Sequence, residues 1–160
     1  MLDIFYENKI IIIFLHVLSA VIWVGGMIAM RYAAYPSFLD IESPAKRLAH
    51  ISKALKRLFY IVFPFTIILL VTAIFIAKGY NLSYGEHDFM SKVKKFIWII
   101  MFLNLIVMML RRSSADKLMQ VGDFAKAKVK LELIGKFMVP LNIILGIIGI
   151  FIGTYFSSIF

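Results

Sequence analysis

Cysteine is absent from this chain of 160 residues, and only 9 residues are acidic. Without cysteine the protein has no disulfides, no thiolate metal sites and no covalently attached c-type haem, so any haem must be held non-covalently. None of the carboxylates lies deep in an apolar stretch. That distribution argues against a proton-driven transporter, because such proteins usually carry an acidic side chain inside the membrane.

Apolar residues, in contrast, make up 62% of the chain, compared with about 45–50% in soluble domains. Four apolar stretches approach the ~20 residues that cross the hydrocarbon core of a bilayer. The first is too long for a signal-peptide core and no small-residue cleavage pattern follows it, so we expect a retained helix. The sequence predicts an all-α fold, an integral membrane four-helix bundle in one domain (residues 1–160), with spans at about 10–30, 58–78, 94–112 and 136–156.

Two helices should extend beyond the membrane at the same end. Apolar residues recur at intervals of three and four between positions 48 and 62, with lysine and arginine between them, which is typical of an amphipathic helix. Ser43 can cap this helix and Pro44 suits its first turn, so we expect one helix from about 44 to 77. The third helix should continue to about 121, where Gly122 ends it and Asp123 can cap the fourth.

The charge distribution predicts the orientation. Of the 18 lysines and arginines, six lie between 31 and 57, seven between 111 and 136, and four between 78 and 95. The positive-inside rule places the two larger groups in the cytoplasm, so both termini would face outward in a bacterial inner membrane. The net charge of +9 then favours contact with membrane lipid and not with nucleic acid. At the ends of the third span the basic side chains can snorkel to the interface; they are Lys92, Lys94, Lys95, Arg111 and Arg112.

His16 is the principal candidate site residue, because a titratable side chain inside an apolar span is costly and usually functional. Trp23 follows seven residues later, so both rings project from one helix face. Gly25 and Gly26 permit close approach of a neighbouring helix or a flat ligand. In the alternative interpretation, His16 hydrogen-bonds across the bundle and Trp23 only packs.

Haem b suits this face, because a neutral imidazole is the usual axial ligand and the porphyrin needs an apolar slot with cations at its rim. Arg31 and Tyr35 near the cytoplasmic boundary are candidate rim residues, although arginine there commonly snorkels to lipid phosphates. His87, in the outer loop, is a candidate second ligand. Copper is the alternative metal, since Cu(I) favours imidazole and thioether donors and Met27 and Met30 share the His16 face. Methionine is equally common as packing in apolar helices.

Other polar and small residues in the spans suggest helix packing. Asn104 and Asn142 can hydrogen-bond across the bundle, and helix four carries a face of small residues, Gly146, Gly149 and Gly153. Glu132 and Lys136 are four residues apart and can form a local ion pair. Two prolines within spans, Pro64 and Pro140, should bend helices or free carbonyl groups.

The segment HVLSAVIWVGGMIAMRYAAYPSF, residues 16–38, resembles the first helix of the copper resistance protein CopD family and of the HemJ-type protoporphyrinogen oxidases. Both carry a histidine followed seven residues later by tryptophan, and the HemJ type continues with an arginine and, four residues on, a tyrosine, as at Arg31 and Tyr35. The Trp-Val-Gly-Gly run at 23–26 is closer to CopD. Three further elements are similar to both families and follow in the same order. They are Arg57-Leu-Phe, Val71-Thr72-Ala73, and Lys92 or Lys94 at the start of the third span.

The resemblance implies a four-helix protein that handles haem b or copper, with His16 as the metal-bearing residue. The first hypothesis is a haem-b redox protein that passes electrons or oxidises a small substrate, as a protoporphyrinogen oxidase-like oxidoreductase would, with a quinone, a porphyrin or a redox protein as partner. The second is a CopD-like copper permease or sequestering protein. The third is a non-catalytic membrane assembly subunit whose glycine faces bind other membrane helices, which can be those of a second copy in a homo-oligomer.

Overall fold

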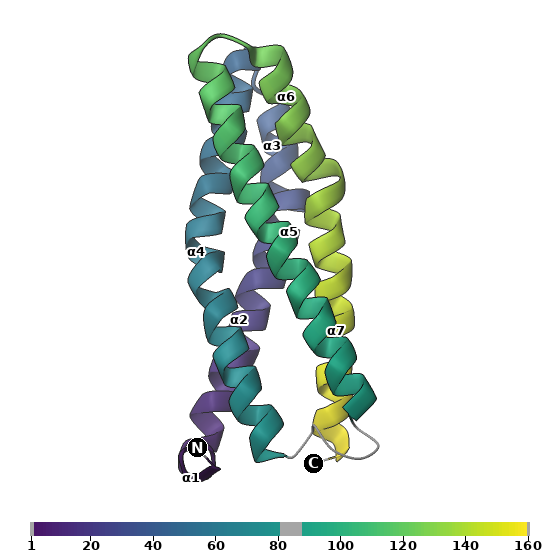
Figure 1. Ribbon diagram of the computed structural model, residues 1–160. Helices are drawn as coiled ribbons and strands as arrows, with labels where there is room; N and C mark the ends of the chain where they lie inside the picture. The colour runs from purple at the N-terminus through teal and green to yellow at the C-terminus, as the bar shows by residue number, and fades with distance from the viewer. Residues whose placement is uncertain (1, 81–87, 160) are drawn as a thin grey trace.

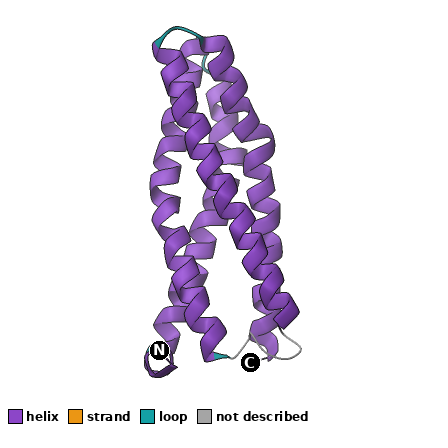
Figure 2. Cartoon of the chain, in the orientation of Figure 1, coloured by secondary structure: helices purple, strands orange, loops and turns teal. Residues whose placement is uncertain are grey.

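The computed structural model describes residues 2–80 and 88–159, and the regular structure in them is helical (Figure 2). Two segments are π-helices, labelled η. The elements in chain order are α1 (Leu2–Glu7), α2 (Lys9–Ala29), η1 (Met30–Ala34), α3 (Tyr35–Leu39), α4 (Pro44–Gly79), α5 (Asp88–Gln120), α6 (Phe124–Leu133), η3 (Ile134–Met138) and α7 (Val139–Ile159).

The described residues form a bundle of four long antiparallel helices (Figure 1). The first is α2 continued by η1 and α3, the last is α6 continued by η3 and α7, and α4 and α5 lie between them in sequence. Both chain termini lie at one end of the bundle, and the α3–α4 and α5–α6 turns lie at the other (Figure 1). We call these the terminal end and the basic end, because 13 of the 18 lysines and arginines fall in residues 31–57 and 111–136 around the two turns.

Each of the four helices is long and apolar enough to cross a membrane. Their most apolar windows have mean hydropathies of 2.4, 2.6, 2.0 and 2.2, and only 22–28% of each window is buried inside the bundle. Most of the apolar surface therefore faces outward, where lipid can cover it. This arrangement confirms the predicted all-α four-helix bundle with multi-pass membrane character.

Helix α4 extends past the membrane as the sequence predicts. It begins with Ser43, whose Oγ accepts a hydrogen bond from the Lys46 backbone N–H at 3.4 Å, and Pro44 occupies its first turn. Its 36 residues span about 54 Å at ~1.5 Å per residue, well beyond the ~30 Å hydrocarbon core. Helix α5 ends at Gln120, Gly122 has a positive φ of 81°, and the Asp123 side chain caps α6. These helix boundaries confirm the prediction.

The core runs the whole length of the bundle, so the extension at the basic end is packed and not a loose projection. Fully buried side chains occur in the apolar half, among them Trp23 and Leu105, and in the extension, among them Leu131 and Ala127. The sequence expectation that apolar residues of the amphipathic segment face inward is confirmed at Leu48, Ile51, Leu55 and Val62, which are 7% exposed or less.

Both π-helical segments end directly before an X-Pro pair, at Pro36 and Pro140. In each, a backbone N–H donates five residues back, from Tyr35 to the Met30 carbonyl and from Val139 to the Ile134 carbonyl. Proline has no N–H and its ring clashes with the carbonyl four residues earlier, so a wider turn relieves the conflict. The expected effect of Pro140 therefore takes the form of a π-helix, whereas α4 continues through Pro64.

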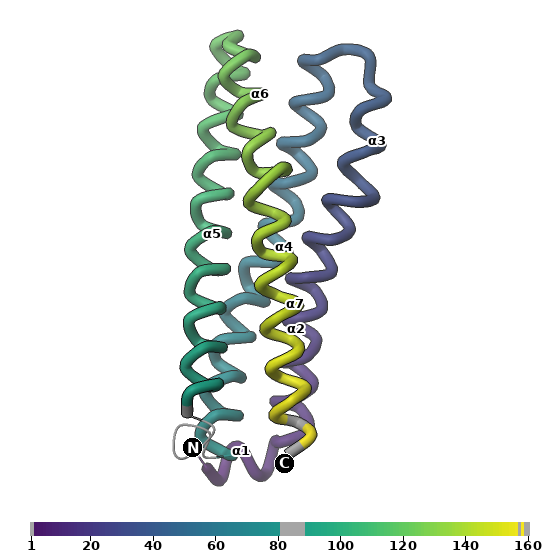
Figure 3. Tube along the Cα trace, turned by 90° about the vertical axis from the view of Figure 1, so that its right-hand side faces the viewer, coloured from purple at the N-terminus to yellow at the C-terminus, as the bar shows by residue number. Residues whose placement is uncertain are grey.

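Helix α1 was not expected from the sequence. It lies across the terminal end of the bundle (Figure 3). Its Phe5 is 1% exposed, and the ring packs directly against Gly79 at the end of α4, where a Cβ would collide with it. The Tyr6 hydroxyl donates to the Gly79 carbonyl at 3.2 Å. A contact between residues 73 positions apart thus holds α1 in place.

Candidate functional site

His16 is half-buried on α2 and is held by a hydrogen bond to α4. Its Nδ1 lies 3.0 Å from Oγ1 of Thr72. The Thr72 hydroxyl directs its one proton to carbonyls of its own helix, with Ile68 O at 2.7 Å and Leu69 O at 3.1 Å. Its oxygen therefore accepts a hydrogen bond from His16 Nδ1–H, which assigns the neutral tautomer whose Nε2 carries a free lone pair. Nε2 is the nitrogen that can bind a metal.

Lys94 of α5 is the charged neighbour of His16 and interacts with it electrostatically. Its side chain is half-buried and leans across to α7, where Nζ lies 3.0 Å from the position that a Cβ on Gly153 would occupy. The expectation that Lys94 snorkels outward as an interfacial anchor is therefore wrong. The absence of a side chain at Gly153 leaves room for the ammonium group inside the bundle.

His16, Thr72, Lys94 and Gly153 form one layer. Each lies six or seven residues from the terminal end of its helix, which corresponds to a depth of about 10 Å at ~1.5 Å per residue. The layer brings an imidazole and an ammonium group together between four apolar helices. Polar groups at this depth need partners, so the layer is the strongest candidate site in the described part of the chain.

Two buried indole N–H groups lie further along the same interior. Trp23 is 1% exposed, and neither its Nε1 nor that of Trp98 has a hydrogen-bond partner among the described residues. Trp98 lies one helical turn from Lys94 and stacks on Phe102 with ring centroids 4.9 Å apart. A buried donor without an acceptor costs about 1–3 kcal/mol. Acceptor atoms of a bound group are one means of satisfying these two N–H groups.

The two glycines after Trp23 have different surroundings. A Cβ on Gly26 would lie 3.0 Å from Leu58 Cδ1 and 3.7 Å from Val62 Cγ2, both on α4. Gly25 is exposed and has nothing within 4 Å of its Cβ position. Gly26 thus permits close packing of α2 on α4, and in this structure its free space is taken by a helix and not left for a flat ligand.

Met27 and Met30 lie on the bundle side of α2, as their spacing from His16 predicts. They are 0% and 7% exposed and belong to the core. Along the helix, Met27 is about 16 Å and Met30 about 21 Å from His16 at ~1.5 Å per residue. Neither sulfur can therefore share one metal ion with the His16 imidazole.

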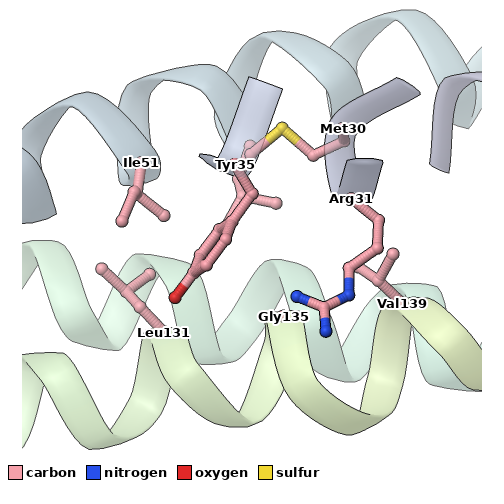
Figure 4. Close-up of a pocket in the computed structure, with 8 residues that line it drawn as sticks. Met30, Arg31, Tyr35, Ile51, Leu131, Gly135 and Val139 are labelled. Atoms are coloured by element: carbon pink, nitrogen blue, oxygen red, sulfur yellow. The ribbon is translucent and has the colours of Figure 1, made fainter. Parts of the chain in front are cut away.

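Arg31 and Tyr35 contribute to a separate pocket where η1 faces η3 (Figure 4). The Arg31 guanidinium lies 5.8 Å from the Tyr35 ring centroid, and both side chains point across to the helix that carries Gly135 (Figure 4). The Tyr35 ring approaches within 3.5 Å of the Cβ position of Gly135. The pocket is lined by Met30, Arg31, Tyr35, Ile51, Leu55, Leu131, Gly135 and Val139.

This pocket is small and distant from His16. Its volume is about 10 Å³, far below the ~300–1,000 Å³ of typical ligand sites. Arg31 is fifteen residues from His16, or about 22 Å along the helix, which is farther than a porphyrin bound at His16 reaches with its propionates. The single face expected from the sequence is therefore divided into two sites at different depths, and Lys94, not Arg31, is the cation that interacts with His16.

The other histidines do not join His16 in the structure. His50 is exposed at the basic end and donates from Nδ1 to the Lys46 carbonyl of its own helix at 2.8 Å. His87 lies outside the described residues. Among residues 2–80 and 88–159 there is no group of three histidine, aspartate or glutamate side chains that could hold a metal ion.

An asparagine pair links α5 to α7 between the two sites, which confirms the expected interaction across the bundle. Asn104 Nδ2 donates to Asn142 Oδ1 and to the Met138 carbonyl, both at 2.8 Å, and Asn142 Nδ2 donates to the Met101 carbonyl at 3.4 Å. Met138 belongs to η3, so its carbonyl takes a side-chain partner at the irregular turn. The predicted local ion pair between Lys136 and Glu132 is also present, at 3.4 Å.

Comparison of the chain with protein family models, with curated proteins and with solved structures gives no match.

Proposed function

We propose that this protein is a membrane redox protein of the CopD/HemJ type that binds haem b through His16 and transfers electrons or oxidises a small substrate. The observation that carries the proposal is the hydrogen bond from His16 Nδ1 to Thr72. Histidines that bind metals usually donate their other ring N–H to a fixed acceptor, which sets the tautomer and the ring orientation. Thr72 provides that acceptor, and Nε2 is left for the metal.

The donor set fits haem better than a bare copper ion. A porphyrin supplies four nitrogens itself and needs one axial imidazole from the protein, whereas a Cu(I) site draws several soft donors from it. His16 supplies the imidazole, and Met27 and Met30 lie too far along α2 to join it. When bound, haem supplies one-electron chemistry, and the protein adjusts its potential by burial and charge.

The remaining residues of the layer have roles that follow from their chemistry. The Lys94 ammonium, beside His16, would pair with a carboxylate such as a propionate. The buried N–H groups of Trp23 and Trp98 are available to carbonyl or carboxylate acceptors. Donors of these kinds also suit a quinone or a porphyrin substrate, which are the small partners we propose for the protein.

We infer an inner bacterial membrane location with both termini outside, from the 13 lysines and arginines around the two turns at the basic end. In this orientation the His16 layer lies in the outer half of the membrane. The Arg31–Tyr35 pocket then lies near the cytoplasmic boundary.

The proposal is tested by visible absorption spectra of detergent-purified protein from haem-replete cells, oxidised and then reduced with dithionite, with total iron and copper counted. His16→Ala should lose the Soret band. His50→Ala is the matched control, because it removes an exposed imidazole at the opposite end, and it should keep the band. Thr72→Val should retain haem but shift its midpoint potential, since the ligand loses its acceptor.

A colourless wild-type protein would refute the haem proposal. An unchanged spectrum in His16→Ala would refute the assignment of the ligand. Stoichiometric copper without haem, lost in His16→Ala, would establish the copper alternative in its place.

A further inference from the structure

A second, larger groove lies between α4 and α5 at the basic end, away from the His16 layer. Its volume is about 400 Å³, within the ~300–1,000 Å³ of typical ligand sites. Small residues of α4 leave space along one wall, and basic side chains of both helices reach into it. The lining residues are Ala45, Ala49, Ser52, Lys53, Lys56, Arg112, Asp116, Met119, Gln120 and Phe124.

The floor of the groove is a fixed hydrogen-bond network. Ser52 of α4 is 2% exposed and donates from Oγ to Asp116 Oδ1 of α5. Arg112 donates from Nη1 to Asp116 Oδ2 at 2.7 Å, and its side chain is only 13% exposed. Asp116 has both oxygens occupied and acts as an anchor that holds the guanidinium in the groove.

The groove retains unpaired positive charge. Arginine has five N–H donors, and Asp116 is the one partner of Arg112 among the described residues. Lys53 is exposed and has no hydrogen-bond or ion-pair partner among the residues that the structure describes. With Lys56, the lining carries three cations and one carboxylate, a net charge of +2. Such a surface favours an anion with several acceptor oxygens, which is the chemistry of a phosphate group.

The position of the groove along the bundle indicates where that phosphate comes from. Arg112 is the second residue after the apolar run of α5 that ends at Leu110, and Lys56 precedes the apolar run of α4 by about one turn. Tyr60, four residues after Lys56, is 69% exposed, and the Lys56 ammonium lies 5.8 Å from its ring centroid. Exposed tyrosine beside lysine is typical of the headgroup level of a membrane.

We propose that the α4–α5 groove is a binding site for the phosphate of an anionic phospholipid. Lys53 and Lys56 contact the phosphate from α4, Arg112 contacts it from α5, and the acyl chains continue along the apolar surface of the bundle beside Tyr60. Basic pockets between membrane helices suit such headgroups, because charge attraction and the adjoining hydrocarbon act together. Asp116 is a positioning residue, since it reaches the lipid only through Arg112.

The test measures retained lipid by native mass spectrometry after purification from nanodiscs of phosphatidylcholine alone or with phosphatidylglycerol. Lys53→Gln/Lys56→Gln is compared with Lys46→Gln/Lys117→Gln, which removes two exposed lysines from the same two helices outside the groove. Each lysine near an anionic headgroup contributes about a fivefold factor in affinity. The groove variant should therefore bind phosphatidylglycerol about thirtyfold more weakly, and the control variant should bind as the wild type does.

Two further measurements separate a guanidinium contact from the effect of charge alone, and a lipid phosphate from free phosphate. Arg112→Lys keeps the charge but loses the guanidinium fork, so it should bind less phosphatidylglycerol than the control variant. Inorganic phosphate, added to protein in neutral detergent, should not raise the melting temperature. Equal binding of phosphatidylglycerol and phosphatidylcholine, or equal binding by the groove and control variants, would overturn the proposal. Stabilisation by inorganic phosphate alone would overturn the lipid as its source.

Discussion

Gly146 of α7 lies directly against Val24 of α2 and Met101 of α5, and Gly146→Ala should weaken the bundle. The added Cβ would collide with Cγ2 of Val24 and lie 3.3 Å from the Met101 Cε. Met101 can move its terminal methyl group, but Val24 is β-branched and 6% exposed, so its rotamer is fixed. The α2–α7 contact must therefore open. Overpacking of this kind costs about 1–3 kcal/mol, offset by ~1 kcal/mol of improved helix propensity.

Gly149→Ala is the matched control, because it lies three residues further along α7 and its Cβ would meet only Ile97 Cγ2, at an ordinary 3.8 Å. Both variants share the propensity gain, so the difference between them isolates the collision. We expect Gly146→Ala to be less stable than Gly149→Ala by about 1–3 kcal/mol. Reversible unfolding in mixed micelles of mild and denaturing detergent, followed by circular dichroism, measures the difference. Equal stability, or a more stable Gly146→Ala, would refute the packing argument.

Two further predictions concern hydrogen bonds. Asn104→Leu leaves Oδ1 of the fully buried Asn142 without its donor and should lower the free energy of unfolding by about 1–2 kcal/mol in the same assay. Asn104→Leu/Asn142→Leu removes the unpaired group and should be more stable than Asn104→Leu, so a less stable double variant would contradict this account. Hydrogen bonds from the Lys126 side chain and backbone N–H lower the pKa of Asp123 from its usual 3.8. The ionised Asp123 cap therefore stabilises α6 fully above pH 3.8, and this stabilisation is lost as the pH falls through the lowered pKa. Thermal unfolding across acidic pH should show a smaller loss of stability for Asp123→Asn than for the wild type, and parallel pH profiles would exclude this contribution.

The fold was largely predictable because its boundaries depend on local chemistry. Ser43 and Pro44 begin α4, and Gly122 and Asp123 separate α5 from α6, by rules that involve only neighbouring residues. Helix α1 was missed because six residues carry no usable periodicity. Its place depends on Phe5 meeting Gly79, a contact between distant parts of the chain.

The candidate site was only partly predictable. His16 was identified because the cost of burying an imidazole is visible in one segment. Lys94 was assigned to the interface because a lysine near the end of a span usually snorkels, and its actual place depends on the register of α5 against α7. The signal that could have found it is Gly153, the small residue at matching depth on the fourth span. The Ser52–Asp116 contact depends in the same way on the register of α4 against α5.

The π-helices η1 and η3, before Pro36 and Pro140, have a geometric consequence for the first and last long helices of the bundle. Each inserts one residue into its helix, which turns everything beyond it by about 100° relative to an uninterrupted α-helix. Met30 and Tyr35, five residues apart, consequently reach the same pocket, and Ile134 and Val139 are both buried at the same interval. Because η1 and η3 face each other, the side-chain positions of both helices rotate at the same level of the bundle. The residues of the basic extension that face inward are thereby shifted by about 100° from the positions that an uninterrupted α-helix would place in line with His16.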